Sequence, residues 1–260
     1  MKIFLACLIT LTLIINLYPH NKKFKISVIQ IDEEFGDKEK NIQKLCYFCE
    51  EAAKYGANII LMPELCTSGY KTATKSWLSK DMIRPMAETI PGKTTNRFSK
   101  ISKKYGCYIV LGMVELTIED GNLYNSLCVI NSDGDIETVY RKINLYTDDK
   151  RWAKKGNLGH KYFDTSYGRF GLMICFDMHF KNPVRHLVEN NASYILFATA
   201  WDAPRPISSY WKAFAIKNDV FLFASDNAIN GESCIITNEG DVLNTLDKGE
   251  EGFIIETINY

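Results

Sequence analysis

The amino-acid sequence predicts a single α/β domain with a partly antiparallel sheet. Its 260 residues, 46% of them hydrophobic, suit one large domain with a sizeable core. Short apolar segments of strand character alternate with longer segments in which apolar residues recur at helical spacing. Near the middle of the chain, two strand-like segments flank a turn-forming Ser-Asp-Gly-Asp sequence, as expected of a hairpin. This alternation is typical of an α/β domain.

The first elements are expected to be two strands, each followed by a helix. Residues 25–31 predict a strand, and residues 37–55 carry apolar side chains on one helical face until Gly56 ends the helix. The two thiols of Cys46-Tyr47-Phe48-Cys49 fall on this apolar face, which favours core packing over a redox or metal site. Residues 58–62 form a continuously apolar strand, and residues 95–105 predict a second helix.

The remaining elements begin with a hairpin-like region and then return to alternation. Residues 107–115, 123–131 and 136–140 predict three strands. Later segments include two predicted helices, at residues 183–189 and 208–216. The later predicted strands are residues 170–174, 194–198, 220–224, 233–237 and 253–256.

Charge and cysteine content narrow the functional class. The chain has 31 basic and 31 acidic side chains, and this balance argues against nucleic acid as a partner. Of the eight cysteines, seven remain when Cys7 of the apolar leader is set aside. An odd number of thiols favours a thiol enzyme in a reducing setting over a disulfide framework.

Residues 1–24 are expected to be a signal-like or membrane-anchor segment that precedes a domain of residues 25–260. Residues 3–18 are apolar and carry no charged side chain. As a helix they would extend roughly 24 Å, less than the roughly 30 Å needed to span a bilayer. No small-residue cleavage site follows them. We expect export or membrane association through residues 3–18, with a segment packed on a cytoplasmic domain as the alternative.

Three reactive side chains follow predicted strands. Glu64 follows the apolar strand NIILM, Lys142 follows IETVYR, and Cys175 follows FGLMI. Reactive groups in open α/β sheets lie just beyond the carboxyl ends of strands. A carboxylate that accepts the thiol proton, a nucleophilic thiolate and an ammonium that stabilises an oxyanion together suit acyl transfer. We expect the pKa of the Cys175 thiol to be lowered, with Lys142 contributing.

The segments around these residues resemble the motifs of the nitrilase superfamily of carbon–nitrogen hydrolases. The resemblance extends from about residue 25 to residue 256 and implies an α-β-β-α sandwich whose subunits commonly pair, hence a homodimer or higher homo-oligomer. It implies Glu64 as general base, Lys142 as oxyanion stabiliser and Cys175 as nucleophile. The segments that carry it are Pro63-Glu64-Leu65 with Gly69-Tyr70, Tyr140-Arg141-Lys142-Ile143-Asn144-Leu145, Gly171-Leu172-Met173-Ile174-Cys175-Phe176-Asp177, Leu123-Tyr124-Asn125-Ser126 and Ser233-Cys234-Ile235-Ile236.

Further candidates come from the same comparison with the family pattern. Asp149 occupies the place of a second acidic residue, seven positions before Gly156. His179 replaces a common arginine, and Asp177 is expected mainly to cap the turn after Cys175. The other supporting or substrate-side candidates are Glu115, Phe176 and Trp201.

The sequence Cys-Phe-Asp resembles the amidase branches of the superfamily. It implies that a small linear amide or carbamoyl compound reacts with water at its C–N bond through a thioester, without a metal or organic cofactor. Two alternatives remain open, namely acyl transfer to an amine acceptor and an inactive binding or scaffold homologue. A pair of Cys175 with His179 is disfavoured because neighbours in sequence do not give the pairing that Cys-His enzymes use.

Overall fold

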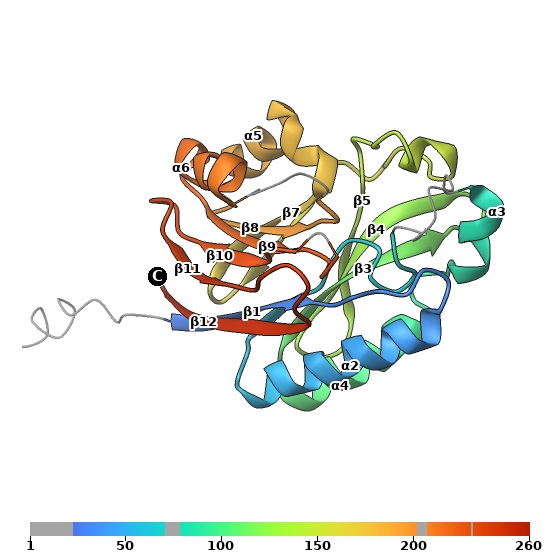
Figure 1. Ribbon diagram of the computed structural model, residues 1–260, viewed down its shortest axis with the longest axis horizontal. Coiled ribbons are helices and arrows are strands. Elements are labelled where there is room, and N and C mark those ends of the chain that lie inside the picture. The colour runs from blue at the N-terminus through green and yellow to red at the C-terminus, as the bar shows by residue number, and fades with distance from the viewer. Residues whose placement is uncertain (1–22, 71–78, 202–206, 230) are drawn as a thin grey trace, which may run out of the picture.

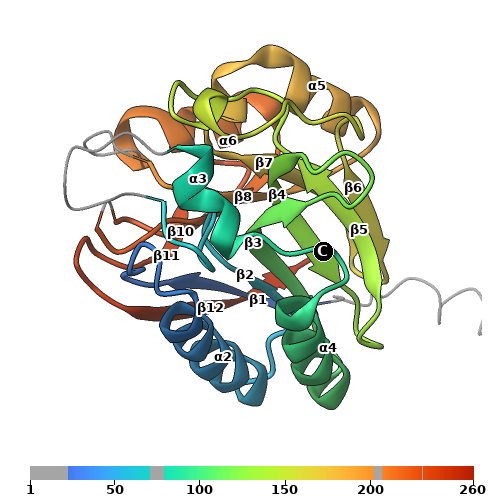
Figure 2. The same cartoon turned by 90° about the vertical axis from the view of Figure 1, so that its right-hand side faces the viewer.

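The computed structural model describes residues 23–70, 79–201, 207–229 and 231–260, and they form four layers, α-β-β-α (Figures 1 and 2). This confirms the expected fold class. The expected leader lies outside the described residues except for Lys23 and Phe24, which already belong to the first strand. Within the described ranges, every helix is too short or too polar to cross a membrane.

The first sheet has the strand order β12-β1-β2-β3-β4-β5. β1 pairs in parallel with β2 and antiparallel with β12, and the pairs β3–β4 and β4–β5 are antiparallel. The strands are β1 (Lys23–Gln30), β2 (Ile59–Leu61), β3 (Tyr108–Leu116), β4 (Leu123–Ile130), β5 (Ile136–Arg141) and β12 (Gly252–Asn259).

The second sheet has the order β11-β10-β9-β8-β7-β6, in which β7, β8 and β9 are parallel. The strands are β6 (Tyr162–Thr165), β7 (Gly168–Ile174), β8 (Tyr194–Ala198), β9 (Phe221–Ser225), β10 (Cys234–Ile236) and β11 (Val242–Thr245). On the outer face of this sheet lie α5 (Lys181–Glu189) and α6 (Lys212–Asn218).

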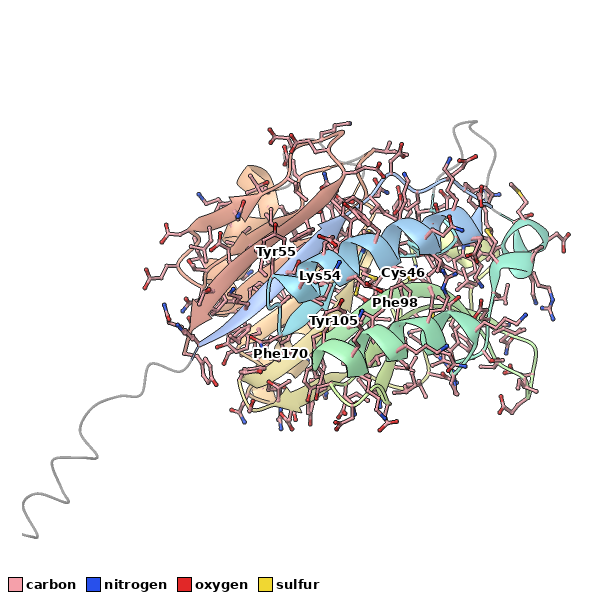
Figure 3. The ribbon with its side chains drawn as sticks, turned by 90° about the horizontal axis from the view of Figure 1, so that it is seen from below. Cys46, Lys54, Tyr55, Phe98, Tyr105 and Phe170 are labelled. Atoms are coloured by element: carbon pink, nitrogen blue, oxygen red, sulfur yellow. The ribbon has the colours of Figure 1, made fainter. Side chains whose placement is uncertain are left out.

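Two amphipathic helices, α2 (Lys38–Lys54) and α4 (Lys93–Tyr105), cover the outer face of the first sheet. Figure 3 shows them side by side across this face. The side chain of Asp37 accepts a hydrogen bond from the Lys40 backbone N–H and so caps α2. Gly56, at φ +85°, follows α2 in the left-handed conformation that glycine adopts without strain.

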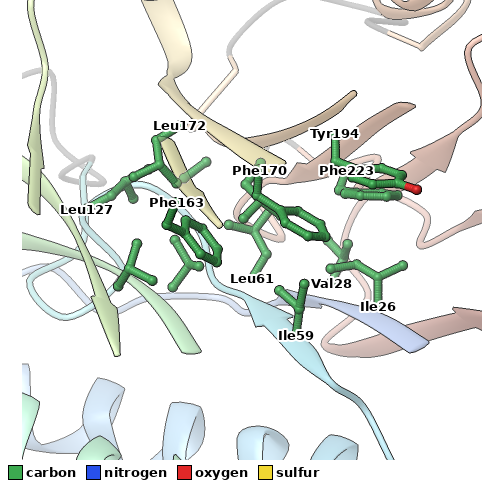
Figure 4. Close-up of a cluster of buried hydrophobic side chains, with 14 of the residues drawn as sticks. Ile26, Val28, Ile59, Leu61, Leu127, Phe163, Phe170, Leu172, Tyr194 and Phe223 are labelled. Carbon is green, nitrogen blue, oxygen red and sulfur yellow. The ribbon is translucent and has the colours of Figure 1, made fainter. Parts of the chain in front are cut away.

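The core between the sheets is built from one face of nearly every strand. Figure 4 shows Phe170, Tyr194 and Phe223 of the second sheet against the aliphatic side chains of β1 and β2. Because side chains alternate along a strand, the other face of each sheet is left for the helices. The four layers thus follow from the apolar strands and the one-sided helices of the sequence.

The carboxyl ends of the central strands of both sheets meet at one end of the molecule. Ser225, the last residue of β9, donates a hydrogen bond from its hydroxyl to the carbonyl of Ile29 near the end of β1, at 2.6 Å. β2 runs parallel to β1, and β7 and β8 run parallel to β9. The segments that follow β2, β7 and β8 are therefore brought together.

The structure differs from the expectation at short elements. β6, β11 and the four-residue helix α3 (Lys80–Ile83) were not anticipated. The helix expected at residues 208–216 is instead a π-helical turn over Ile207–Trp211 followed by α6. Two single turns of 3-10 helix, Asp149–Arg151 and Cys175–His179, carry candidate site residues.

Candidate active site

Cys175 lies at a sharp strand-to-helix turn. It follows the last residue of β7 and begins the 3-10 helix Cys175–His179. Its φ of +40° is unusual for a residue with a side chain. Backbone strain of this kind clusters at functional sites, and strand-to-helix turns present nucleophiles in other hydrolases. The thiol is half-buried.

Glu64 lies in the turn after β2 and is completely buried. Its Oε1 accepts hydrogen bonds from Lys142 Nζ and Asn125 Nδ2, each at 2.7 Å. Its Oε2 accepts one from the backbone N–H of Ala200 at 3.1 Å. The turn packs so closely on β3 that a Cβ at Gly112 would lie 2.1 Å from the Pro63 carbonyl oxygen. Glycine at this position of β3 therefore permits the placement of Glu64.

Lys142 directly follows β5, and its ammonium lies between two carboxylates. It donates to Glu64 Oε1 at 2.7 Å and to Asp149 Oδ2 at 2.6 Å, and all three side chains are fully buried. The backbone N–H of Tyr146 also donates to Asp149 Oδ2, at 3.1 Å. Asp149 therefore helps to orient the ammonium that also contacts Glu64.

The protonation states of Lys142 and Glu64 follow from their burial and from the charges around them. Burial alone would lower the pKa of Lys142, but the charges of Asp149 and Glu64 raise it well above its ordinary value. Burial raises the pKa of Glu64, Lys142 opposes this, and Asp149 raises that pKa further. Lys142 is thus a permanent cation, and Glu64 is a stronger base than a solvated carboxylate.

The Cys175 thiol does not have the lowered pKa that we expected. Burial raises its pKa and the charge of Glu64 raises it further, whereas Lys142 lowers it. The physical reason is chiefly burial, which disfavours the charged thiolate, and the charge of Glu64, which outweighs the opposing charge of Lys142. The thiol is therefore neutral at rest, and its proton must leave as it reacts.

Asp177 connects the cysteine turn with the segment after β5. Its Oδ2 accepts from the Tyr140 hydroxyl at 2.7 Å and from the Ile174 backbone N–H at 3.1 Å. Its Oδ1 accepts from the backbone N–H and the side-chain amide of Asn144, at 3.0 and 2.9 Å. With these four contacts, Asp177 orders the turn, as its expected capping role implied.

An aromatic group surrounds His179. The rings of His179 and Trp201 stack with centroids 5.0 Å apart and an interplanar angle of 10°. The Phe176 ring lies 5.0 Å from His179 and 5.3 Å from Tyr146, centroid to centroid. Burial lowers the pKa of His179. Phe176, His179 and Trp201 are thus brought together on the segments that follow Cys175 and β8.

Glu115 lies away from this site. It forms an ion pair with Arg141 at 2.5 Å and accepts a hydrogen bond from the Ser126 hydroxyl at 2.7 Å. Because side chains alternate along a strand, Glu115 shares the helix-covered face of the first sheet with Met113. The triad lies toward the other face, so Glu115, expected as a supporting or substrate-side residue, is placed where it supports Arg141, the neighbour of Lys142.

Several residues of the site were not anticipated as such. Asn125 bridges the carboxylates, since its Nδ2 donates to Glu64 and lies 3.5 Å from Asp149 Oδ1. The Tyr70 hydroxyl lies 3.5 Å from the same Asp149 oxygen. Thr199 and Ala200, directly after β8, adjoin the Cys175 sulfur. Asn125 and Tyr70 stand in motifs that were recognised, but nothing local in the sequence marks Thr199 or Ala200.

Cysteines and the other side chains that commonly ligate metals are scattered over the residues that the structure describes. In the described parts of the chain, His, Cys, Asp and Glu side chains form no cluster of three or more that could hold a metal ion. Cys49 is buried and Cys46 half-buried in the core beneath α2, and both are free thiols.

Comparison with known proteins gives a consistent result. The carbon–nitrogen hydrolase family model matches residues 25–260. A probable nitrilase of Schizosaccharomyces pombe is 31% identical over 252 residues, covering 91% of this chain and 89% of that protein. A 2-oxoglutaramate amidase of Bacillus subtilis is 29% identical over 245 residues, covering 89% of each chain. An amidase from Nesterenkonia is similar in structure with a TM-score of 0.77 at 19% identity, covering 94% of this chain and 93% of that one.

Proposed function

Because this chain belongs to the carbon–nitrogen hydrolase family, within the nitrilase superfamily, we propose that it hydrolyses the C–N bond of a small linear amide or carbamoyl compound through a thioester on Cys175. The observation that carries the proposal is the buried Lys142 ammonium between Glu64 and Asp149, beside a half-buried thiol. A permanent cation and a strengthened base next to a neutral thiol suit acyl transfer.

In the proposed first step, the thiol proton moves to Glu64 as sulfur attacks the substrate carbonyl carbon. Both lone pairs of Glu64 Oε1 are engaged by Lys142 and Asn125, whereas Oε2 has a single donor, the Ala200 N–H. Oε2 is therefore the proton acceptor. The carbonyl π electrons move to oxygen, and the Lys142 ammonium stabilises the resulting charge.

The tetrahedral intermediate collapses when the C–N bond breaks and Glu64 returns the proton to the leaving nitrogen. A thioester on Cys175 and free ammonia or amine result. Water then adds to the thioester while Glu64 accepts its proton, and the C–S bond breaks to give a carboxylic acid and the thiol. The sum is one amide and one water converted into one acid and one amine.

The names of the relatives support amides as the substrate class. One relative is a 2-oxoglutaramate amidase, and a structure of the Nesterenkonia amidase has the acetamide moiety of fluoroacetamide added covalently at its active-site cysteine. We therefore test straight-chain amides, 2-oxoglutaramate and carbamoyl compounds first.

The test measures ammonia or amine release by the full-length chain from this panel, with Cys175→Ala and Cys175→Ser as variants. We expect activity in the wild type and its loss in both variants. Intact-mass measurement during turnover should detect an acyl adduct on the wild type alone. Activity that survives Cys175→Ala would contradict the nucleophile, and an inert wild type would favour a binding or scaffold role. Hydroxylamine added as acceptor separates hydrolysis from acyl transfer, because a transferase would form hydroxamate in preference to acid.

We also propose that two copies of the chain pair through the outer helices of the second sheet. Apolar side chains are exposed on these helices, with Val188 of α5 38% and Ile216 of α6 55% accessible. Light scattering after size-exclusion chromatography should report a dimer or higher oligomer, and Val188→Glu with Ile216→Glu should reduce it to a monomer. A monomeric wild type would contradict the pairing.

Residues 1–24 are proposed to act as a signal or anchor ahead of the domain, on the basis of the uncharged apolar residues 3–18. Cell fractionation combined with intact-mass measurement tests this. A membrane-bound full-length chain or an exported shortened chain supports it, whereas a full-length chain in the cytoplasmic fraction contradicts it.

A further inference from the structure

A buried hydroxyl without a polar partner lies beside the nucleophile. Thr199 is fully buried directly after β8, and its backbone N–H donates to the Ser225 carbonyl at 2.8 Å. Its Oγ1 has no hydrogen-bond partner among the nitrogen and oxygen atoms of the described residues. Such groups are rare in folded proteins, because a buried unpaired hydroxyl costs about 1–3 kcal/mol. An unpaired hydroxyl at this position therefore suggests a role that offsets its cost in stability.

The strand register explains why Thr199 meets Cys175. In the parallel pair β7–β8, Ile174 lies opposite Ala198, so the next residue on each strand is Cys175 on one side and Thr199 on the other. The register of the second sheet therefore places Cys175 and Thr199 next to each other. The Thr199 hydroxyl and the Ala200 N–H both act on the sulfur and lower the pKa of the Cys175 thiol, against the larger effects of burial and Glu64.

The other donors near the sulfur have different acceptors: two of the three Lys142 N–H groups donate to carboxylates, and in the proposed function the third serves the substrate oxygen. The Lys142 ammonium donates to Glu64 and Asp149, and the Ala200 N–H donates to Glu64 Oε2. The Thr199 hydroxyl, in contrast, donates no hydrogen bond to a carboxylate. It is therefore the donor that can turn fully to the sulfur when charge develops there.

We propose that Thr199 is a further catalytic residue, whose hydroxyl donates a hydrogen bond to the Cys175 sulfur as the thiol proton passes to Glu64. The inference deepens the proposed function and rests on Cys175 as the nucleophile. A neutral thiol is a weak acceptor, whereas a thiolate is a strong one. The bond is thus absent at rest and forms as the sulfur becomes charged. Interactions that strengthen only on the way to the transition state are the ones that raise the rate.

The experiment compares Thr199→Val, which replaces the hydroxyl by a methyl group of similar size, with Thr199→Ser, which keeps the hydroxyl. The first readout is the rate at which iodoacetamide alkylates Cys175 across pH, followed by peptide mass mapping so that Cys46 is not counted. We expect Thr199→Val to slow alkylation about 10- to 100-fold at a fixed pH, the loss of one hydrogen bond to a charged group. The apparent pKa of alkylation should rise by about one to two pH units. Thr199→Ser should stay within about threefold of the wild type.

The second readout separates catalysis from structure. Thr199→Val removes a hydroxyl that is unsatisfied at rest, so its melting temperature should equal or exceed that of the wild type while its acylation is slower. Thr67→Val is the matched control, because Thr67 Oγ1 is also buried without a polar partner and is not among the groups that act on the Cys175 sulfur. We expect it to leave alkylation unchanged.

Wild-type alkylation in Thr199→Val would overturn the inference, as would equal slowing in Thr67→Val. A Thr199→Val that melts well below the wild type would also overturn it, since the hydroxyl would then be satisfied at rest; Thr199→Ala checks that result with a smaller side chain. Activity in Cys175→Ala would instead contradict the proposed function, so the two failures are distinguishable.

Discussion

Asn144 donates two hydrogen bonds to a single carboxylate oxygen of Asp177, from its backbone N–H at 3.0 Å and from its side-chain amide at 2.9 Å. Asn144 lies two residues after Lys142, and Asp177 lies two residues after Cys175. The contact therefore ties the segment that carries the ammonium to the turn that carries the thiol. Lys142 follows a strand of the first sheet and Cys175 follows a strand of the second. The distance between their side chains therefore depends on contacts that join the two sheets, such as that of Asn144 with Asp177.

Replacing Asp177 by alanine should destabilise the protein strongly. The variant leaves the Tyr140 hydroxyl and two backbone N–H groups without their acceptor. At about 1–3 kcal/mol for each unsatisfied buried group, we expect unfolding in urea to require about 3–5 kcal/mol less free energy. Asn144→Ala removes one side-chain donor and should cost only about 1 kcal/mol. Equal stability of Asp177→Ala and the wild type would contradict this role.

Replacing Asp149 by asparagine should shift the acid limb of kcat/KM to lower pH. Burial raises the pKa of Glu64, Lys142 opposes this, and the charge of Asp149 raises that pKa further. Without the Asp149 charge the Glu64 pKa falls, so more of the base form persists in acid and activity survives to lower pH. The maximal rate should drop about 10- to 100-fold, because Lys142 loses one charged partner. Asp149→Glu keeps the charge and should leave the acid limb in place; an identical shift in both variants would argue against a charge effect.

Replacing Glu33 by glutamine should raise the melting temperature at pH 8 but not at pH 4. Burial raises the pKa of Glu33 well above its ordinary value, and the nearby Asp226 and Glu64 add to this. A folded-state pKa above the unfolded one means that stability falls as pH rises from the unfolded pKa through the folded pKa. Glutamine does not ionise and avoids that loss. Glu34→Gln is the control, because Glu34 is an exposed residue paired with Lys40 and should change the melting temperature little. A gain of equal size at both pH values would refute the assignment.

Replacing Glu115 by glutamine should leave kcat/KM within about twofold of the wild type. The carboxylate pairs with Arg141 on the face of the first sheet that is turned away from the triad. We expect a loss of about 1–3 kcal/mol in unfolding free energy, since the largely buried Arg141 loses its charged acceptor. Activity assays and urea unfolding of one preparation give both values. A fall in kcat/KM without a loss of stability would contradict this prediction and would indicate that Glu115 acts on the substrate.

The layered fold was predictable because its signals are local. The apolar strands and the one-sided helix at residues 37–55 correspond to β1, β2, β7, β8 and α2. The short edge strand β11 (Val242–Thr245) is largely exposed and lacks an apolar face, so no periodicity marks it. β6 and α3 have four residues each, which is too short for a pattern to emerge.

The three catalytic candidates were predictable because each of them follows the end of a predicted strand. Glu64, Lys142 and Cys175 each follow a strand, and the structure brings Glu64 and Lys142 within 2.7 Å. The partners that tune them come from distant positions, such as the Ala200 N–H, 136 residues from Glu64. For Glu115 the sequence indicates a strand but not which face of the sheet each side chain occupies. The pKa of the Cys175 thiol depends on its burial and on the charges of Glu64 and Lys142 around it, which only the assembled structure reveals.

The pairing of β1 with β12 has a consequence for engineering. Lys23, the first residue of β1, lies opposite Asn259, and Figure 1 shows the start of β1 near the C-terminal end of the chain. This is the end of β1 opposite to its carboxyl end, where the catalytic segments gather. A domain whose first and last strands pair in this way allows circular permutation of residues 23–260, in which residues 23 and 260 are joined by a short linker and the chain is opened elsewhere. Opening it between Asn131 and Asp135, in the turn from β4 to β5, would leave the segments after β2, β5, β7 and β8 unbroken and would put the new ends beside the start of β3, at the end of the sheet away from the catalytic segments. A permuted chain of this kind could be immobilised at its new ends with its thiol facing away from the support.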